Sequence, residues 1–357
     1  MNHFGAIREK LSDYHIDAMF ISGEANRFYA SGFHSTGTDG VALVTRDQTY
    51  YFTDSRYIEA ANRQITDAVI EMTGRGESYS TRMNAVIQRE GIQTMGFEET
   101  YMTVAEYTRY REALHCTLVP MAKLLSELRM TKDAQELETM VAAQRISERA
   151  LTEILNDIRP GVTEQEIAAK LQYLMLRYGA AEMSFDPIVV SGPNGSMPHG
   201  VPSARKMQAG EFVTMDFGCV YHGYCSDMTR TIAIGHVTEE MDHVYHTVLQ
   251  AQLAGIAAAR SGVTGRAVDA AGRDVIAAAG YGDYFGHGFG HGVGVEIHEL
   301  PTASPAYDKP LPVGAVISAE PGIYLPGKFG VRIEDVIVLT EAGCENLTKA
   351  PKELIIL

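Results

Sequence analysis

The chain has 357 residues, of which 45% are hydrophobic and 21% charged, a composition typical of a globular protein that has room for two domains. The formal net charge of −15 argues against nucleic-acid binding, which depends on clustered Lys and Arg. No apolar run approaches the ~20 residues that cross a bilayer, the N-terminus has no signal-peptide pattern, and the four cysteines are unpatterned, so we expect a cytoplasmic protein without a membrane partner.

The N-terminal part of the chain alternates strand and helix patterns. Short apolar runs predict strands at residues 17–21, 40–45, 50–53 and 94–97, and the second and third form a hairpin. No constellation of catalytic residue types accompanies these strands. Pro120 marks the end of this region. We therefore expect an α/β domain over residues 1–121 and a second domain over residues 122–357.

Long helical patterns follow this boundary and then alternate with strands. We expect helices at residues 123–129, 134–159, 163–178, 238–259 and 264–279, and strands between residues 184 and 234. Thr163 and Glu166 have the spacing of a capping box. Residues 159–169 resemble residues 260–270, and each segment lies between two helical patterns. This similarity predicts an internal duplication.

The strand-rich sequence after the first copy predicts a hairpin that carries two aspartates. If its turn centres between Tyr221 and His222, Asp216 and Asp227 lie directly opposite each other. Directly opposed side chains have Cβ atoms ~5 Å apart, and like charges at that distance are destabilising. A cation is therefore expected between the two aspartates.

A second hairpin is predicted after the second copy, with its turn at Pro326 and Gly327. The same counting, centred on Gly327, places Glu320 opposite Glu334. Four carboxylates and a nearby histidine are ligands that suit two Mn²⁺, Co²⁺ or Zn²⁺ ions. Carboxylates that bridge ions ~3.5–4 Å apart would let them share a water and polarise a carbonyl group.

The nearby histidines lie in a glycine-rich stretch, His287-Gly288-Phe289-Gly290-His291-Gly292-Val293-Gly294, which is followed by His298. Glycine at alternate positions disfavours a helix and lets another backbone, a metal or a substrate approach closely. The stretch does not match the nucleotide-binding pattern GxGxxG, and the chain has neither HExxH nor GxSxG. Cys219 and Cys225 are expected on different faces of the first hairpin, which argues against a disulfide between them.

On these motifs the chain resembles the pita-bread metallopeptidases, in particular the Xaa-Pro dipeptidases (prolidases) and aminopeptidase P. The motifs, in chain order, are Met215-Asp216-Phe217-Gly218, Ser226-Asp227-Met228-Thr229-Arg230-Thr231, the glycine-rich stretch, Ser318-Ala319-Glu320-Pro321-Gly322-Ile323-Tyr324 and Val331-Arg332-Ile333-Glu334-Asp335. The resemblance covers most of the chain. It implies an α/β (α+β) fold, in which a creatinase-like α/β domain precedes a pita-bread domain of duplicated helix pairs and antiparallel hairpins.

The resemblance also implies the roles of individual residues. The ligands of two divalent metal ions, with Mn²⁺ as the first choice and Co²⁺ or Zn²⁺ as alternatives, would be Asp216, Asp227, His291, Glu320 and Glu334. Asp227 and Glu334 would bridge the ions. Glu320 would also relay the proton of the attacking water, and His287 and His298 would transfer protons and stabilise the tetrahedral gem-diolate. His199, Arg332 and Tyr324 would face the substrate, for which the glycines would leave room, although a core or hydrogen-bonding role stays open for Tyr324.

The function that the resemblance implies is that of a dinuclear metal-dependent exopeptidase that hydrolyses Xaa-Pro bonds of proline-containing peptides. Proline has no N–H and a fixed φ, so its peptide bond needs a dedicated pocket. Methionine aminopeptidases normally lack such an N-terminal domain, so its presence argues against that group. Its short length favours a dipeptidase over aminopeptidase P, which acts on longer peptides. The presence of all five ligands argues against creatinase, which uses no metal, and against a non-catalytic pita-bread binding module. The resemblance further suggests a homodimer.

Overall fold

The structure, a computed structural model, describes residues 2–357 and contains two compact units, Met1–Arg129 and Met130–Leu357. Helix α6 (Ala122–Arg129) belongs to the first unit, because Leu124 and Leu125 are buried in a hydrophobic cluster of that unit. The division therefore lies after Arg129, later in the chain than the expected boundary after residue 121. Within residues 2–357, none of the helices is both long and apolar enough to cross a membrane.

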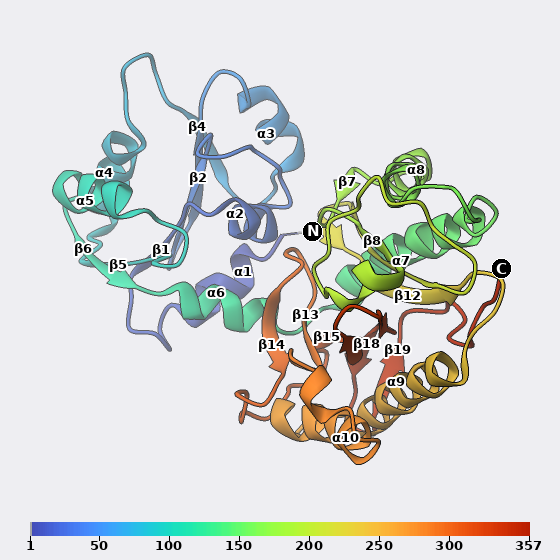
Figure 1. Cartoon of the computed structure of the whole chain (residues 1–357). Helices are drawn as coiled ribbons and strands as arrows, with labels where there is room; N and C mark the ends of the chain where they lie inside the picture. Colours follow the sequence, from blue (N-terminus) through green and yellow to red (C-terminus); the bar gives the residue numbers. More distant parts are fainter. Residues whose placement is uncertain (1) are drawn as a thin grey trace. The chain divides into compact units, whose positions relative to one another are not determined.

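The first unit is a six-stranded sheet with helices on both faces (Figure 1). Its strands, in spatial order, are β4 (Val69–Met72), β3 (Thr49–Thr53), β2 (Val41–Thr45), β1 (Ala18–Ile21), β5 (Thr94–Phe97) and β6 (Thr117–Pro120), and only the pairings of β2 are antiparallel. Its other helices are α1 (Phe4–Lys10), α2 (Glu24–Ser31), α3 (Ile58–Gln64), α4 (Tyr79–Glu90) and α5 (Val104–Ala113). The four predicted strands are present as β1, β2, β3 and β5.

The alternation of side chains explains why these strands read as continuous apolar runs. Along β1, Met19 and Ile21 join the cluster that includes residues of α1, α2, α3 and α6, whereas Ala18 and Phe20 join the cluster that includes residues of α4 and α5. Both faces of the sheet are therefore buried, so no position in β1 favours a polar residue.

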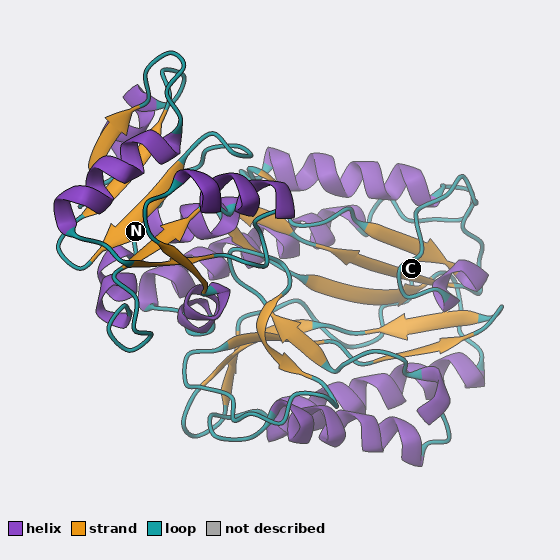
Figure 2. Cartoon of the chain, turned by 90° about the vertical axis from the view of Figure 1, so that its left-hand side faces the viewer, coloured by secondary structure: helices purple, strands orange, loops and turns teal. Residues whose placement is uncertain are grey.

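The second unit encloses its strands between two helix pairs (Figure 2). Helices α7 (Ala134–Ile154) and α8 (Glu164–Arg177) share a hydrophobic cluster with β8 (Ile188–Ser191), β9 (Phe212–Phe217) and β12 (Met228–Ala233). The second pair is α9 (Glu239–Ala258) and α10 (Gly265–Ala278), and it lies near the sheet of β13 (Gly290–Gly292), β14 (Glu299–Ala303), β15 (Val316–Ala319), β18 (Asp335–Leu339) and β19 (Cys344–Asn346). The remaining elements are β7 (Glu182–Met183), β10 (Cys219–Tyr221), β11 (Tyr224–Cys225), β16 (Gly322–Leu325), β17 (Phe329–Arg332) and the 3₁₀ turns η1 (Gly192–Ser196) and η2 (Gly282–Tyr284). The helix predicted for residues 134–159 is shorter than expected, since α7 ends at Ile154 and turns precede Pro160.

The backbone repeats the same helix entry in both halves of this unit. Gly161 and Gly262 have φ values of 93° and 82°, which glycine adopts without steric cost. Two residues later, Thr163 and Thr264 cap α8 and α10 with their side chains, and Glu166 completes the predicted capping box of α8. The internal duplication predicted from the sequence is confirmed.

Candidate metal centre

The first hairpin brings Asp216 and Asp227 to one face, but not opposite each other. In the pairing of β9 with β12, the residue opposite Asp216 is Thr229. The turn residues His222 and Gly223 have positive φ values of 46° and 82°, so the turn centres between them, one residue later than expected. The expected direct opposition is therefore wrong. The two aspartates are diagonal neighbours instead, because a shift of two residues keeps a side chain on the same face.

The second hairpin has the predicted register. The β15–β18 and β16–β17 ladders share a single register centred on Gly327, and Glu320 and Glu334 occupy matching positions between these ladders. The backbone N–H of Glu320 donates to the carbonyl of Phe289, and that of Glu334 donates to the carbonyl of Thr229. These two bonds connect the second hairpin to the glycine-rich stretch and to the first hairpin.

The glycines around His291 let neighbouring strands approach β13. A Cβ atom on Gly290 would lie 2.0 Å from the carbonyl oxygen of Ser318 on β15, and one on Gly292 would lie 2.5 Å from the carbonyl oxygen of Glu299 on β14. At these two positions the expectation that glycine leaves room for the substrate is wrong. Glycine is required there because two backbones approach His291 from either side.

Phe289 anchors the glycine-rich stretch to the helix pair behind it. Its fully buried ring lies against Gly255 of α9 and Gly272 of α10, where a Cβ atom would lie 2.1 Å and 2.6 Å from the ring. The two helices thus present glycines where the aromatic ring inserts. This packing fixes the backbone that carries His291.

The side chains expected to bind metal meet in one cavity. Asp227, His291 and Glu334 each offer a ligand atom, and these atoms lie within 4.8 Å of one another. His291 Nε2 lies 3.6 Å from Asp227 Oδ2 and 3.2 Å from Glu320 Oε1. Asp216 lines the same cavity, which has a volume of about 460 Å³. All five expected ligands are therefore gathered at one site.

Asp216 supplies an independent sign that the site has capacity for a cation. Its Oδ2 accepts a hydrogen bond from Arg332 Nη2 at 2.6 Å, whereas its buried Oδ1 has no hydrogen-bond partner within the described residues. A buried carboxylate oxygen without a partner is costly, and metal ligation would satisfy it. The carboxylate and imidazole donors of the site fit a divalent transition metal.

The pKa values of the site also indicate a place for a cation. Burial and the charges of Glu334 and Asp216 raise the pKa of Asp227 well above its usual value, and burial with the charges of Glu320 and Asp216 does the same to Glu334. Burial acts against ionisation of both partners in the His291–Glu320 pair, yet their interaction raises the pKa of His291 to about 9 and lowers that of Glu320 to about 2. The protonated imidazole thus partly balances a cluster of acids that a divalent cation would balance more fully.

The remaining histidines surround the carboxylates. His199, His287 and His298 line the cavity, and the ring of His298 stands edge-on to that of His291 with centroids 4.3 Å apart. Burial lowers the pKa of His287, and burial together with the charge of His291 lowers that of His298. Both rings are therefore neutral at neutral pH, and each carries one N–H.

Tyr324 lies behind the cavity lining rather than in it. Arg332 Nη1 donates to the Tyr324 hydroxyl at 2.8 Å, and that hydroxyl lies 2.9 Å from His287 Nε2. His287 Nδ1 lies 2.9 Å from the carbonyl oxygen of Gly288, which can only accept a hydrogen bond. The proton of His287 therefore sits on Nδ1, and Nε2 accepts from Tyr324. The Tyr324 hydroxyl therefore hydrogen-bonds to both Arg332 and His287, and its role toward the substrate stays a prediction.

Thr229 is a functional residue that the sequence argument missed. Its hydroxyl donates to Glu334 Oε2 at 2.7 Å and accepts from Arg332 Nε at 3.1 Å. It follows Asp227 by two residues along the hairpin, so strand alternation could have placed it on the same face.

Two further residues hydrogen-bond to proposed metal ligands, and only one of them could have been found from the sequence. Ser318 donates to Glu320 Oε1 at 3.1 Å and accepts the backbone N–H of His291 at 3.0 Å, and its place two residues before Glu320 is a usable signal. Gln144 on α7 donates to the carbonyl of Asp227 at 3.0 Å and accepts its N–H at 3.3 Å. Its separation from Asp227 in the sequence gave no such signal.

Comparison with known proteins extends over both units. Residues 138–341 match the profile of Metallopeptidase family M24, and residues 5–131 match that of the Creatinase/Prolidase N-terminal domain. The Xaa-Pro dipeptidase of Pyrococcus furiosus is 35% identical over 341 residues, which cover 95% of this chain and 95% of the relative. The solved structure of a Xaa-Pro dipeptidase from Bacillus anthracis is 41% identical with a TM-score of 0.95, and it covers 99% of each chain. That of an X-Pro aminopeptidase from Thermotoga maritima is 38% identical with a TM-score of 0.90, and the match covers 96% of this chain and 98% of the other.

Proposed function

The chain belongs to metallopeptidase family M24, and on this premise we propose that it is an exopeptidase that hydrolyses Xaa-Pro bonds, with Xaa-Pro dipeptides as its main substrates. The family and the two-domain fold agree with the resemblance seen in the motifs. The observation that carries the proposal is the cavity where Asp227, His291 and Glu334 converge, with Asp216 and Glu320 beside them. Relatives along the full chain are named Xaa-Pro dipeptidases. An aminopeptidase activity on longer peptides is the second candidate, which the Thermotoga maritima relative favours.

Two divalent metal ions would be held by Asp216, Asp227, His291, Glu320 and Glu334. Mn²⁺ is the first choice for their identity, and Co²⁺ or Zn²⁺ are the alternatives. The unpartnered Asp216 Oδ1 and the raised pKa values of Asp227 and Glu334 support this assignment. Bound there, such ions would supply an acidified water and a polarised scissile carbonyl.

The side chains around the ligands would move the protons. As a metal ligand His291 would be neutral, and the bound ions would supply the positive charge beside Glu320 in its place, so Glu320 would stay ionised. Glu320 can then accept the proton of the attacking water and return it to the proline nitrogen. The neutral His298 would donate its N–H to the oxygen on which negative charge develops.

The other cavity residues would bind and orient the substrate. His287, which the resemblance assigns to proton transfer, has a partner for each ring nitrogen, the Gly288 carbonyl and the Tyr324 hydroxyl. We propose that it instead presents a fixed ring to the substrate. Arg332 is held by Asp216 and Tyr324 at the same wall. His199 lines the cavity from a different segment, between β8 and β9, and would contact the peptide.

Location and assembly stay predictions. The four cysteines are all free thiols, which suits the reducing compartment expected from the sequence. A homodimer is suggested by the family resemblance, and multi-angle light scattering on the purified chain would measure it. A monomer in that measurement would exclude the dimer.

A substrate panel tests the proposed activity. Protein stripped of metal and reloaded with Mn²⁺ would be offered Ala-Pro, an Xaa-Pro-Xaa tripeptide and a dipeptide without proline, with the Asp227→Asn variant as the control. We expect metal-dependent cleavage of Ala-Pro by the wild type alone. The ratio of Ala-Pro to tripeptide cleavage separates a dipeptidase from an aminopeptidase. No metal-dependent cleavage of either proline substrate would refute the proposal.

A further inference from the structure

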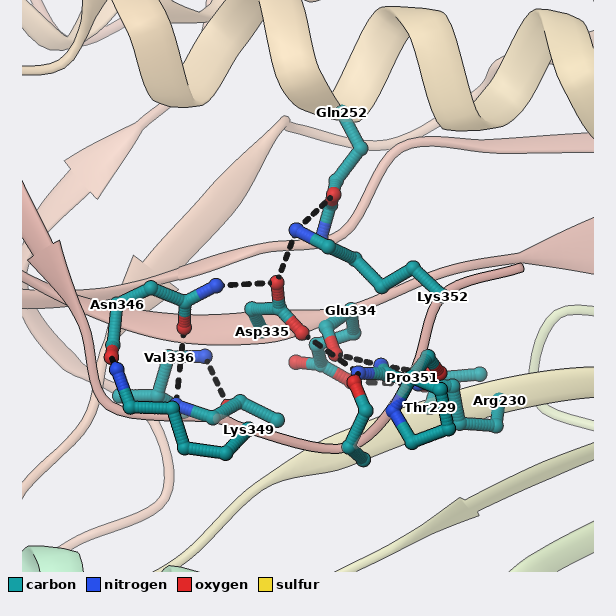
Figure 3. A network of polar contacts seen from close by, with 12 residues as sticks. Thr229, Arg230, Gln252, Glu334, Asp335, Val336, Asn346, Lys349, Pro351 and Lys352 are labelled. Carbon is teal, nitrogen blue, oxygen red and sulfur yellow. Dashed lines mark hydrogen bonds and ion pairs between the residues drawn. The ribbon is translucent and has the colours of Figure 1, made fainter.

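A buried arginine, Arg230, lies beside the backbone of the proposed ligand Glu334 (Figure 3). Arg230 on β12 is 2% exposed. The five N–H groups of its guanidinium all have acceptors: Nε donates to Pro351 O at 2.8 Å, Nη1 to Thr229 O at 3.0 Å and Glu334 O at 2.5 Å, and Nη2 to Asp335 Oδ1 at 2.8 Å and Ala350 O at 2.8 Å. An arginine has five such donors, so its capacity is fully used.

Asp335 is the counter-ion of this arginine and is equally buried. Its second oxygen, Oδ2, accepts from Lys352 Nζ at 2.7 Å and from Asn346 Nδ2 at 2.6 Å. Lys352 Nζ also donates to Gln252 of α9 at 3.1 Å (Figure 3). Every buried charge in this network is therefore paired and hydrogen-bonded, which is the condition under which a buried ion pair is tolerated.

The network joins the two halves of the duplicated unit at the place where their carboxylates meet. Arg230 belongs to the three-stranded sheet of the first half, whereas Glu334 precedes β18 in the five-stranded sheet of the second half. The backbone bond from Glu334 N–H to Thr229 O also crosses here at 3.1 Å. Asp227 and Glu334 come from opposite halves, and ionising both of them without a cation would set like charges against each other across this junction.

We propose that Arg230, with Asp335 as its counter-ion, is a positioning residue that holds Asp227 and Glu334 at the separation a shared cation requires. The inference rests on the proposed metal-binding function. Arg230 is absent from the residues that line the cavity, and strand alternation directs its side chain to the face opposite Thr229. It acts through the backbone, because its Nη1 donates hydrogen bonds to the carbonyls of both Thr229 and Glu334.

The geometry requires arginine rather than any cation. A lysine keeps the positive charge but has only three donors on one nitrogen, so it cannot reach acceptors on both strands and on the C-terminal segment together. Arg230→Lys therefore separates charge from geometry. Because supporting residues typically contribute 10- to 100-fold to metal affinity, we expect Mn²⁺ affinity to fall by about that factor.

A matched control is available in the first unit. Arg27 is 1% exposed, and its guanidinium donates to the carbonyls of Ser22, Ser35 and Gly37. Arg27→Lys makes the same chemical change at a similarly buried arginine in a unit that carries none of the five proposed ligands. It should lower thermal stability and leave Mn²⁺ affinity unchanged.

The test is a calorimetric titration of metal-stripped full-length protein with Mn²⁺, with bound metal per chain counted by atomic emission and folding checked by circular dichroism. Asp335→Asn, which removes the counter-ion without changing size, provides a second route if Arg230→Lys does not fold. We expect both variants to bind Mn²⁺ more weakly, and their effects to be less than additive in the double variant. The inference about Arg230 is overturned if Asp335→Asn or folded Arg230→Lys binds Mn²⁺ with wild-type affinity, or if Arg27→Lys loses as much affinity as they do. These outcomes leave the proposed metal centre standing. Failure of the wild type to bind Mn²⁺ overturns the proposed metal centre and this inference together.

Discussion

Removal of the Thr229 hydroxyl should weaken metal binding as well as the fold. Thr229 is fully buried, donates to Glu334 Oε2 at 2.7 Å and accepts from Arg332 Nε at 3.1 Å. Thr229→Val keeps the branched shape and leaves Glu334 and the charged Arg332 without this partner. A hydrogen bond to a charged group contributes about 1.5–3 kcal/mol. At about 2–4 °C per kcal/mol, the melting temperature of the metal-free protein should fall by about 3–12 °C. Mn²⁺ affinity should fall by about 10- to 100-fold, because the hydroxyl orients a proposed metal ligand.

Thr231 provides the control for this prediction. It lies two residues further along β12 and is 1% exposed, and its hydroxyl bonds to the backbone carbonyl of Arg332 and to Thr214. Thr231→Val should also lower the melting temperature but should bind Mn²⁺ as the wild type does. Thermal melts and Mn²⁺ titrations of both variants give the comparison. Unchanged Mn²⁺ affinity in Thr229→Val, or equal losses in the two variants, would refute the reasoning.

Three further predictions concern stability and turnover. Because the folded pKa values of Asp227 and Glu334 are raised, their contribution to stability is fully present below the unfolded pKa of about 4 and is lost as pH rises through the folded values. Melts in EDTA should therefore show the wild type losing stability relative to the Asp227→Asn/Glu334→Gln variant as the pH rises above about 4, and a constant difference would contradict this. Gly290→Ala should cost about 1–3 kcal/mol or more in urea unfolding, because its Cβ would lie 2.0 Å from a carbonyl oxygen, whereas Gly286→Ala, with no described atom within 4 Å, should be neutral. His298→Ala should retain bound Mn²⁺ while Ala-Pro turnover falls by about 10²–10³-fold, and loss of the metal would assign it a different role.

The two hairpins show what local sequence determines. The register that aligns Glu320 with Glu334 could be predicted, because Pro326 and Gly327 specify a turn with a clear centre. The first hairpin has no equally clear turn signal, because its turn places His222 at a positive φ, which is uncommon for a residue other than glycine. The residue predicted to lie opposite Asp216 was therefore wrong by two positions. The face of the hairpin that carries the aspartates was still predicted correctly, because side chains alternate between faces with a period of two.

The long-range support of the site could not be predicted in the same way. Arg230 and Asp335 belong to motifs that carry the family resemblance, but nothing in the sequence around them indicates that they pair. Nor does it indicate that Lys352 and Asn346 complete the network. The glycines around His291 could be read from the sequence. Whether they make room for a substrate or for a neighbouring strand depends on which backbone segments the fold places beside them. The packing of α6 onto the first unit likewise depends on tertiary contacts rather than on the proline that precedes it.

We propose that five residues from two duplicated hairpins and a glycine-rich strand hold a dinuclear metal centre that cleaves Xaa-Pro bonds. The most direct measurement titrates metal-free protein with Mn²⁺ and records bound metal per chain and the rate of Ala-Pro hydrolysis in the same samples. We expect no hydrolysis without metal, and a rate that rises with Mn²⁺ until two ions are bound per chain. Full activity in the metal-free protein, or no hydrolysis with both ions bound, would contradict this proposal.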